Sequence, residues 1–387
     1  MEFRLATPAD EAAVKWLWAY CFESYEPFFT WYFTKYYKAE NTVVGVYQSG
    51  RLRTCLQLIP YQIFLRGRVV DSSYIVGLAT FPEGRRGGLI KELLAASLAE
   101  MRRRRHFVSL LMPFKASFYY PYQWEFCYHH LKYSLNLADL RPVAASAGQF
   151  RLIRDFTGID DLQAVYRQFT AGRHGYVVRS EQNWQNLLQA HFDEKGFVYL
   201  LEKEGEPRGY VIYRLQPGLL SVLEMAYADV QAQRGLLQFL YNHRSQVDKL
   251  EWNAPIDDLT HFSLPDPKQG VQLYPFLTAR LVDVARVLEK IVYPAVTAAV
   301  MLTVTDDLAP WNNQSFRLTV TEGVPTVEAG IACGEVECTI GGLTQLVFGR
   351  LSAYELAAAG KLKGPAEAIA VLAALFPPCN NYINEYY

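Results

Sequence analysis

Few cysteines occur in this sequence, and none of them lies in a cluster that would bind a metal. The six cysteines are scattered over 387 residues, without a C-x-x-C motif or a Cys/His set at the spacing of zinc ligands. We therefore expect no metal site. Cys333 and Cys338 are close enough in sequence to face each other across a hairpin, but we expect both thiols to be reduced in a cytoplasmic protein.

An excess of charge of one sign and a long apolar run are also missing. The chain has 38 Lys and Arg against 39 Asp and Glu, so charge gives no reason to expect binding to nucleic acid or to an anionic membrane. The longest apolar run, 291–304, is shorter than the roughly 20 residues that span a bilayer. Glu2, Arg4, Asp10 and Glu11 interrupt any N-terminal signal sequence. We expect a cytoplasmic protein.

Aromatic residues are abundant, with 26 Tyr and 22 Phe. Many are concentrated near the N-terminus, and no single helix face can bury so many rings. Some of them must line a cleft or an interface, although packing in the core and between subunits explains them equally well. These residues are Trp16, Trp18, Tyr20, Phe22, Tyr25, Phe28, Phe29, Trp31, Tyr32, Phe33, Tyr36 and Tyr37.

The most informative stretch is VGLATFPEGRRGGLIKELLAASL, residues 76–98. An apolar strand ends at Thr80, a Pro/Gly turn follows, and an apolar-periodic helix begins at Leu89. The first N–H groups of a helix have no internal partner and carry the positive end of the helix dipole. Glycine also lets a ligand approach the backbone closely, so the turn is suited to hold a pyrophosphate.

The motif in this turn excludes two common nucleotide sites. It has neither the G-x-x-x-x-G-K-[ST] of a Walker loop nor the G-x-G-x-x-G of a dinucleotide fold. The pattern R-x-x-G-x-I instead resembles the [QR]-x-x-G-x-[GA] turn of GNAT acyltransferases, which binds the pyrophosphate of acetyl-CoA. Ile90 replaces the usual small residue. A solvated Arg-Gly turn that caps a core helix remains the alternative.

Strands and helices alternate along the whole chain, which predicts a mixed α/β layer fold. A helix is expected from Asp10 through the aromatic region. The small-residue segment 140–150 is typical of a linker, and the plan then partly repeats. In the repeat, the turn before the helix at Leu237 keeps only one glycine, Gly235. We expect a degenerate copy of the first domain that binds no cofactor, followed from about Arg280 by a small antiparallel sheet backed by helices.

Several ordered landmarks carry a resemblance to one family. The segment FYYPYQWE resembles the F-Y-x-x-[FY]-G-[FWY] motif of GNAT enzymes. With the other landmarks, it makes the chain resemble the enhanced intracellular survival (Eis) family of N-acetyltransferases, over essentially its whole length. The landmarks are LATFPEGRRGGLI (78–90), FYYPYQWE (118–125), YPFLTARLVDV (274–284), VTDDLAPWNN (304–313), GLTQL (342–346) and the segment 356–362.

The resemblance implies a fold of two tandem GNAT-like domains, the second degenerate, followed by a sterol carrier protein-like α+β domain. The expected boundaries are 1–143 for the catalytic GNAT domain, 144–279 for the degenerate domain and 280–387 for the last. The family's members assemble as trimers or hexamers, so we expect a homo-oligomer.

The resemblance also implies where acetyl-CoA would bind. The backbone of the strand at residues 78–80 would pair with the pantetheine arm, and the following turn would hold the pyrophosphate. Two residues after the next strand would flank the thiol end. The expected cofactor-binding residues are Leu78, Ala79, Thr80, Arg85, Arg86, Gly87, Gly88, Leu89, Ile90, Lys91, Phe114 and Lys115.

The implied reaction is direct attack of an amine on the thioester in a ternary complex. Tyr119 would be the general acid that protonates the leaving thiolate, although a packed core tyrosine is the alternative. The family's general base is the C-terminal α-carboxylate, which here belongs to Tyr387. Its free pKa is about 3.5, so burial must raise that pKa for useful proton transfer.

The resemblance leaves the acceptor broad: an aminoglycoside- or polyamine-like polycation, or a lysine. Carboxylates suited to bind it, by residue type alone, are Glu23, Glu26, Glu125 and Glu385, each of which is equally explained as solvated surface. The chain departs from the family at Pro121 and at Gln123, where the family usually has Gly. The alternative function is a non-catalytic CoA-binding or regulatory protein, and a lipid-carrier role for the last domain is a further one.

Overall fold

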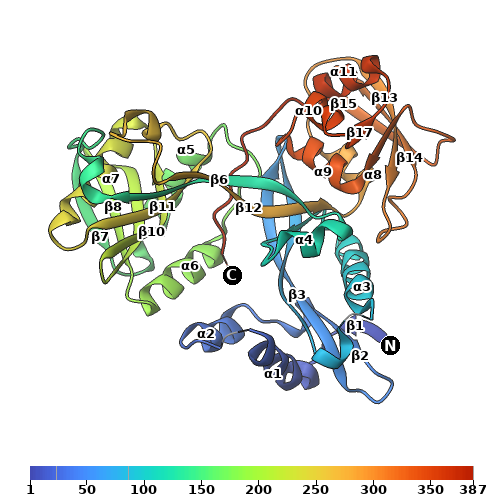
Figure 1. Ribbon diagram of the computed structural model, residues 1–387, viewed down its shortest axis with the longest axis horizontal. Coiled ribbons are helices and arrows are strands. Elements are labelled where there is room, and N and C mark those ends of the chain that lie inside the picture. The colour runs from blue at the N-terminus through green and yellow to red at the C-terminus, as the bar shows by residue number, and fades with distance from the viewer. Residues whose placement is uncertain (23, 86, 387) are drawn as a thin grey trace. The chain divides into compact units, whose positions relative to one another are not determined.

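The computed structural model describes residues 1–22, 24–85 and 87–386. The chain divides into two compact units, and each is described by itself below (Figure 1). The first unit consists of Met1–Tyr128, His174–Val178 and Phe276–Tyr387, and the second of His129–Arg173 and Arg179–Pro275. Helices and strands both contribute substantially, as the predicted mixed α/β class requires.

The larger sheet of the first unit has the strand order β1-β2-β3-β4-β5-β12. All its ladders are antiparallel except that between β4 and β5. β12 belongs to this unit from Phe276 on. The strands are β1 (Glu2–Leu5), β2 (Thr42–Val46), β3 (Leu52–Leu65), β4 (Arg68–Thr80), β5 (Val108–Leu111) and β12 (Val271–Leu281).

Four α-helices accompany this sheet: α1 (Glu11–Cys21), α2 (Phe28–Lys35), α3 (Leu89–Arg103) and α4 (Ala116–Tyr119). α3 forms as expected, since its apolar residues recur at helical spacing and are buried. The expectation of one helix from Asp10 through the aromatic region is wrong, because α1 ends at Cys21 and α2 begins after Pro27. Proline has no backbone N–H and disfavours helical conformation in the residue before it.

A β-bulge interrupts β4 beside its apolar core. Cys55 pairs with Ala79 and Gln57 with Val76, so Gly77 and Leu78 together face the single residue between the two partners on β3. Gly77 has φ +62°, and a Cβ on it would lie 2.2 Å from Cζ3 of Trp18. Only glycine fits there, because the backbone is left-handed and the α1 indole lies against it.

The second unit has the strand order β6-β11-β10-β9-β8-β7, with β6 included from His129 on. Its helices are α5 (Ile159–Thr170), α6 (Glu181–Asp193) and α7 (Val230–Tyr241), and α7 packs against β8, β9 and β10. The repeated plan expected from the sequence is therefore present. The strands are β6 (Glu125–Asn136), β7 (Gln149–Ile153), β8 (Phe197–Lys203), β9 (Glu206–Gln216), β10 (Leu219–Tyr227) and β11 (Lys249–Pro255).

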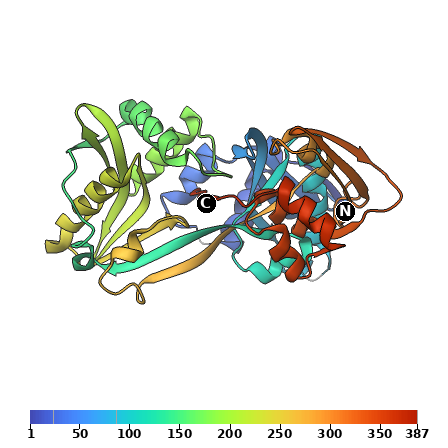
Figure 2. The same cartoon turned by 90° about the horizontal axis from the view of Figure 1, so that it is seen from above.

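The C-terminal part of the first unit is a second sheet with the order β15-β14-β13-β16-β17. Figure 2 shows its red C-terminal helices gathered beside the orange strands. The expectation that this sheet is wholly antiparallel is wrong for one pair of strands, because β13 and β16 are parallel. The elements are α8 (Val284–Lys290), β13 (Ala298–Thr305), β14 (Ser315–Thr321), β15 (Val324–Ala329), β16 (Val336–Thr339), α9 (Ile340–Phe348), α10 (Ala353–Ala358), β17 (Leu362–Lys363) and α11 (Ala366–Leu375).

Gly77→Ala tests the bulge. The Cβ of the alanine must displace the Trp18 indole, and the alanine must adopt a left-handed backbone conformation. We therefore expect a loss of about 3 kcal/mol in the free energy of unfolding. Gly50→Ala is the matched control, since Gly50 has φ +78° with nothing within 4 Å of the added carbon. Backbone strain alone should cost about 1 kcal/mol there. Equal losses in urea unfolding would contradict the close packing of Trp18.

Candidate active site

A cavity of about 340 Å³ lies where β4 and β5 separate. The parallel ladder between the two strands ends at the pair Ile75 and Leu111. Beyond that pair, among the described residues, no other strand takes the place of β5 beside β4. The cavity is lined by Trp18, Phe22, Phe28, Tyr74, Ile75, Val76, Gly77, Leu78, Leu111, Met112, Pro113, Phe114 and Tyr119.

Three residues of β4 were expected to bind the cofactor, and only one of them faces the cavity. Leu78 lines the cavity, whereas Ala79 and Thr80 are buried and do not line it. The Ala79 carbonyl accepts a hydrogen bond from Oγ1 of Thr54 on β3, at 2.8 Å. The Thr80 carbonyl accepts one from Nε of Arg85, at 3.1 Å. The side of the bulge that faces the cavity is therefore formed by Val76, Gly77 and Leu78.

The glycine turn leads into α3 without a side-chain cap. Gly88 is the N-cap residue, with φ +77°, and a Cβ on it would meet nothing within 4 Å. The Lys91 N–H donates to the Gly88 carbonyl at 2.9 Å. The N–H groups of Leu89 and Ile90 lie too early in the helix to reach a carbonyl within it, so they have no intrahelical partner. This end of α3 can hold an anion, as the sequence predicts. Arg86, also predicted there, lies outside the described residues.

The corresponding helix of the second unit has its N-terminus occupied. The Asp229 carboxylate accepts a hydrogen bond from the Ala232 N–H at 2.8 Å and pairs with Arg208. Burial opposes ionisation of Asp229, but these hydrogen bonds outweigh it and lower the pKa of the carboxyl group. A fixed negative charge at this helix end repels a second anion. The expectation of a turn around Gly235 is wrong, because α7 begins at Val230 and Gly235 lies buried inside it.

Tyr119 is the last residue of α4, and its ring lines the cavity. It is only 4% exposed, and its ring centroid lies 5.9 Å from that of Phe114 and 5.0 Å from that of Phe118. Burial raises the pKa of the Tyr119 hydroxyl well above its usual value. The hydroxyl is therefore protonated at neutral pH and can donate a proton into the cavity.

The turn after Tyr119 accommodates both departures from the family motif. Pro121 lies in the first turn of a short 3₁₀ segment (Tyr120–Tyr122), where proline needs no hydrogen-bond partner. Gln123 has φ +67°, a conformation that glycine adopts without strain. The glutamine thus keeps the backbone shape expected of the usual glycine, at a cost of about 1–2 kcal/mol.

The C-terminal tail is buried in the first unit beside the cavity wall. Asn381, Tyr382, Ile383, Asn384 and Glu385 are all buried. The Glu385 carbonyl accepts a hydrogen bond from the hydroxyl of Tyr74, a cavity residue, at 3.4 Å. The Tyr386 ring centroid lies 4.9 Å from that of Phe276. Tyr387, the expected general base, lies outside the described residues.

The inserted segment His174–Val178 holds this tail in place. The segment bonds to β3 through Phe64, and its His174 bonds on the other side to Asn380 and Tyr382. Nε2 of His174 accepts from the Arg66 N–H, so Nδ1 must carry the proton that it shares with Oδ1 of Asn381, at 2.7 Å. His174 is therefore neutral in the folded protein.

The candidate substrate carboxylates have different surroundings. Glu26 accepts hydrogen bonds from Thr30 at the start of α2. Glu125 pairs with Lys361 at 2.8 Å. Neither of them lines the cavity. Glu385 is buried in the tail beside Tyr74, and Glu23 lies outside the described residues.

Several cavity residues were not predicted as site residues. The sequence singled out Trp18, Phe22 and Phe28 only as part of an aromatic excess. All three line the cavity, whereas Tyr32 and Phe33 are buried behind Trp18 and do not line it. Gly77 was read as part of an apolar strand, although a glycine inside a strand is a known signal of a bulge. Lys115, predicted to flank the thiol, is the N-cap residue before α4 and does not line the cavity.

Comparisons with known proteins agree with this architecture. Models of the acetyltransferase (GNAT) domain match residues 2–127 and 175–287, and a sterol carrier protein domain model matches residues 284–384. An uncharacterized N-acetyltransferase of Streptomyces avermitilis is 24% identical over 364 residues, which are 87% of this chain and 86% of that protein. The chain is a GNAT acyltransferase.

Solved structures share the fold over the full length. A GCN5-related N-acetyltransferase from Anabaena variabilis has a TM-score of 0.87 at 23% identity, and covers 100% of both chains. Eis1 from Mycobacterium abscessus has a TM-score of 0.78 at 21% identity, also over 100% of both chains. Two GNAT domains followed by a sterol carrier protein domain confirm the resemblance to the Eis-like family.

None of the helices in the described part of the chain is long and apolar enough to cross a bilayer. Within residues 1–22, 24–85 and 87–386, no group of three His, Cys, Asp or Glu side chains is arranged to hold a metal ion. Cys333 is exposed and Cys338 is buried, and both are free.

His174 makes the anchoring of the tail sensitive to pH. Burial, only partly offset by Asn381, lowers the pKa of His174 to about 4, whereas an unfolded histidine titrates near 6.5. Between these values the unfolded chain binds more protons, so the free energy of unfolding should fall as pH drops from 6.5 towards 4. The slope is up to about 1.4 kcal/mol per pH unit for one histidine.

The measurement is urea unfolding between pH 6.5 and 4 for the wild type and for His174→Gln, which removes this titration. The variant should have the shallower slope. His191, whose pKa burial also lowers to about 4, is the matched control in the second unit. His191→Gln should flatten the slope but leave the exchange protection of amides 381–385 intact. An unchanged slope in His174→Gln would contradict the neutral, buried assignment.

Proposed function

We propose that the first domain transfers an acetyl group from acetyl-CoA to a primary amine, by direct attack in a ternary complex. The observation that carries this proposal is the opening between β4 and β5, which leads into a cavity lined by the protonated Tyr119. A strand edge without a neighbour can pair with an extended arm such as pantetheine, and a nearby proton donor can serve the leaving thiolate.

In this proposal, acetyl-CoA lies along the bulged strand. Backbone groups from Leu78 to Thr80 pair with pantetheine, although Ala79 and Thr80 already bond within the protein and contribute less than Leu78. The pyrophosphate is bound by the turn before α3 and by its first N–H groups. The residues of this turn are Arg85, Arg86, Gly87, Gly88, Leu89, Ile90 and Lys91. Phe114, which is 74% exposed and lines the cavity, and Lys115 flank the thiol end.

The proposed reaction includes two proton transfers, one to the leaving sulfur and one from the attacking amine. The neutral amine nitrogen attacks the thioester carbonyl carbon, and the C–S bond breaks as the amide C–N bond forms. Tyr119 gives its phenolic proton to the leaving sulfur. The amine proton goes to the C-terminal carboxylate carried by Tyr387. Burial of the tail from Asn381 to Glu385 supports a chain end placed near the cavity, and low polarity around a carboxylate raises its pKa towards that of a useful base.

For the acceptor, we propose an amine of an aminoglycoside- or polyamine-like polycation, or of a lysine. The rings of Trp18, Phe22 and Phe28 line the cavity, and aromatic faces attract ammonium groups. Among the described carboxylates, Glu385 is the candidate that we retain, because its backbone carbonyl bonds to the cavity residue Tyr74, although Glu385 itself does not line the cavity.

We also propose that the protein is cytoplasmic and assembles as a trimer or hexamer. Its exposed aromatic side chains support an interface between copies. Trp16, Tyr20 and Tyr25 are each more than half exposed, at 57%, 53% and 67%. Aromatic residues at such positions are enriched in protein interfaces.

Tyr119→Phe tests the general acid. Loss of the phenolic proton should lower kcat by about 10²- to 10⁴-fold with little change in the KM for acetyl-CoA. The reason is that the proton-transfer step is impaired, whereas the binding of acetyl-CoA is not. The measurement is thiol release with a panel of polyamines, aminoglycosides and a lysine peptide. Tyr120→Phe is the control, since Tyr120 is 43% exposed and does not line the cavity. An unchanged kcat in Tyr119→Phe would remove Tyr119 from the mechanism.

Deletion of Tyr386 and Tyr387 tests the general base. We expect turnover to be abolished while calorimetric affinity for acetyl-CoA is retained, because the donor contacts lie on β4 and α3. Extension of the chain by two glycines keeps every native side chain and moves only the carboxylate, and it should also stop turnover. Wild-type rates in either protein would rule out the terminal carboxylate as the base.

A further inference from the structure

A buried ion pair joins the C-terminal domain to the sheet of the first domain. Arg280 lies near the end of β12, where it pairs with Ser109 of β5, and Asp306 directly follows β13. Both side chains are 0% exposed, and Nη2 of Arg280 lies 2.5 Å from Oδ1 of Asp306. Neither residue lines the cavity, so the reaction proposed above gives them no role.

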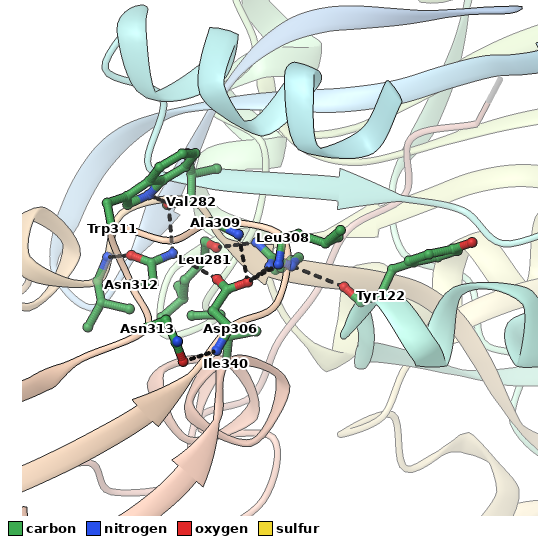
Figure 3. A network of polar contacts seen from close by, with 12 residues as sticks. Tyr122, Leu281, Val282, Asp306, Leu308, Ala309, Trp311, Asn312, Asn313 and Ile340 are labelled. Carbon is green, nitrogen blue, oxygen red and sulfur yellow. Dashed lines mark hydrogen bonds and ion pairs between the residues drawn. The ribbon is translucent and has the colours of Figure 1, made fainter. Parts of the chain in front are cut away.

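The Asp306 carboxylate is fixed by its own loop (Figure 3). Its Oδ1 accepts from the N–H groups of Leu308 and Ala309, each at 3.0 Å, and its Oδ2 accepts from Nδ2 of Asn312 at 3.0 Å. Asn312 also bonds to the backbone of Val282 and Val284. The carboxylate position is therefore determined by the loop 306–312 of the C-terminal domain, which Asn312 ties to the chain after β12.

Arg280 extends from this anchor to the turn that follows Tyr119. Its Nε donates to the Tyr122 carbonyl at 3.1 Å, a contact that reaches the labelled Tyr122 in Figure 3. Its guanidinium lies 5.1 Å from the ring centroid of Trp124, whose Nε1 donates to Ser109 Oγ at 3.2 Å. The guanidinium thus holds the residues on both sides of the left-handed Gln123.

The turn held by Arg280 is continuous with the helix that carries Tyr119. α4 ends at Tyr119, and the 3₁₀ segment from Tyr120 to Tyr122 follows without a break. A displacement of the Tyr122 carbonyl is therefore passed on to Tyr119 through one helical turn. Misplacement of a catalytic group by about 1 Å can cost roughly 10²-fold in rate.

We propose that Arg280 and Asp306 are positioning residues for acetyl transfer: the C-terminal domain sets the place of the Tyr119 hydroxyl through them. This inference rests on the proposed role of Tyr119 as general acid. The C-terminal domain then contributes to catalysis by a route separate from the chain terminus. It would be needed even if the terminal carboxylate were supplied in another way.

The chemistry of the pair favours arginine over other cations. A guanidinium donates in several fixed directions, here to Asp306, to Tyr122 and to the Leu281 carbonyl at 3.3 Å. Lysine would keep the charge but cannot reach all three acceptors in a fixed geometry. Removal of one partner alone leaves a buried charge unpaired, so a charge-preserving or doubly neutral change isolates the positioning effect.

The first variant is Arg280→Lys, and the second is the neutral pair Arg280→Gln with Asp306→Asn, which serves if the first does not fold. For the variant that folds, we expect kcat to fall at least tenfold at saturating substrates, while the Kd for acetyl-CoA changes less than twofold. A kcat within twofold of the wild type would overturn the proposal.

The matched control is Arg179→Lys in the second unit. Arg179 and Glu224 form an equally buried pair at 2.7 Å, each side chain 1% exposed, and the Arg179 guanidinium lies 4.4 Å and 4.7 Å from the ring centroids of Tyr166 and Trp184. Arg179→Lys should lower the Tm to a similar extent but leave kcat within twofold. Equal losses of kcat in both variants would mean a general loss of stability and would overturn the proposal.

A double-mutant cycle with Tyr119→Phe separates this inference from the proposed function. If Arg280 acts through Tyr119, then Tyr119→Phe with Arg280→Lys should have the kcat of Tyr119→Phe alone. If the kcat losses of the two single variants multiply in the double variant, the positioning role is overturned, while Tyr119 remains the acid. A Tyr119→Phe variant with wild-type kcat would instead refute the proposed function itself.

Discussion

The separation of β4 from β5 is the constraint on which the rest of the candidate site depends. Trp18 of α1 packs so closely on β4 that only a left-handed glycine fits at position 77, and the strand bulges there. The ladder with β5 has already ended at Ile75 and Leu111. A regular strand would have continued the sheet and closed the space that the cavity residues now line.

The second unit shows what the same plan looks like without these features. Its helix α7 also follows a strand and a turn, but the Asp229 side chain caps the helix and occupies the place of an external anion. α3, in contrast, begins at a glycine with no side-chain cap. The difference between a helix end open to an anion and one closed by its own carboxylate thus comes from one residue type at the N-cap.

Local sequence patterns predicted much of this structure. The strand, glycine turn and helix from Tyr74 to Arg103 form as expected because their signals lie within one continuous segment. The bulge at Gly77 was not predicted: the glycine within the strand was a local signal for it, but the tryptophan that packs against it lies far away in the sequence. The tail depends on His174, which comes from an inserted segment, and no local pattern reveals that pairing. Arg280 did carry a signal: a charged residue inside the apolar run LTARLV must find a buried partner.

Hydrogen–deuterium exchange with saturating acetyl-CoA is the most direct test of the central claim that the bulged strand and the open helix end form the donor site. The account predicts slower exchange in residues 76–80 and 87–91 when acetyl-CoA is present, and no change in residues 229–237 of the second unit. Unchanged exchange in the first two segments, or equal protection at Asp229 and the helix after it, would contradict the account.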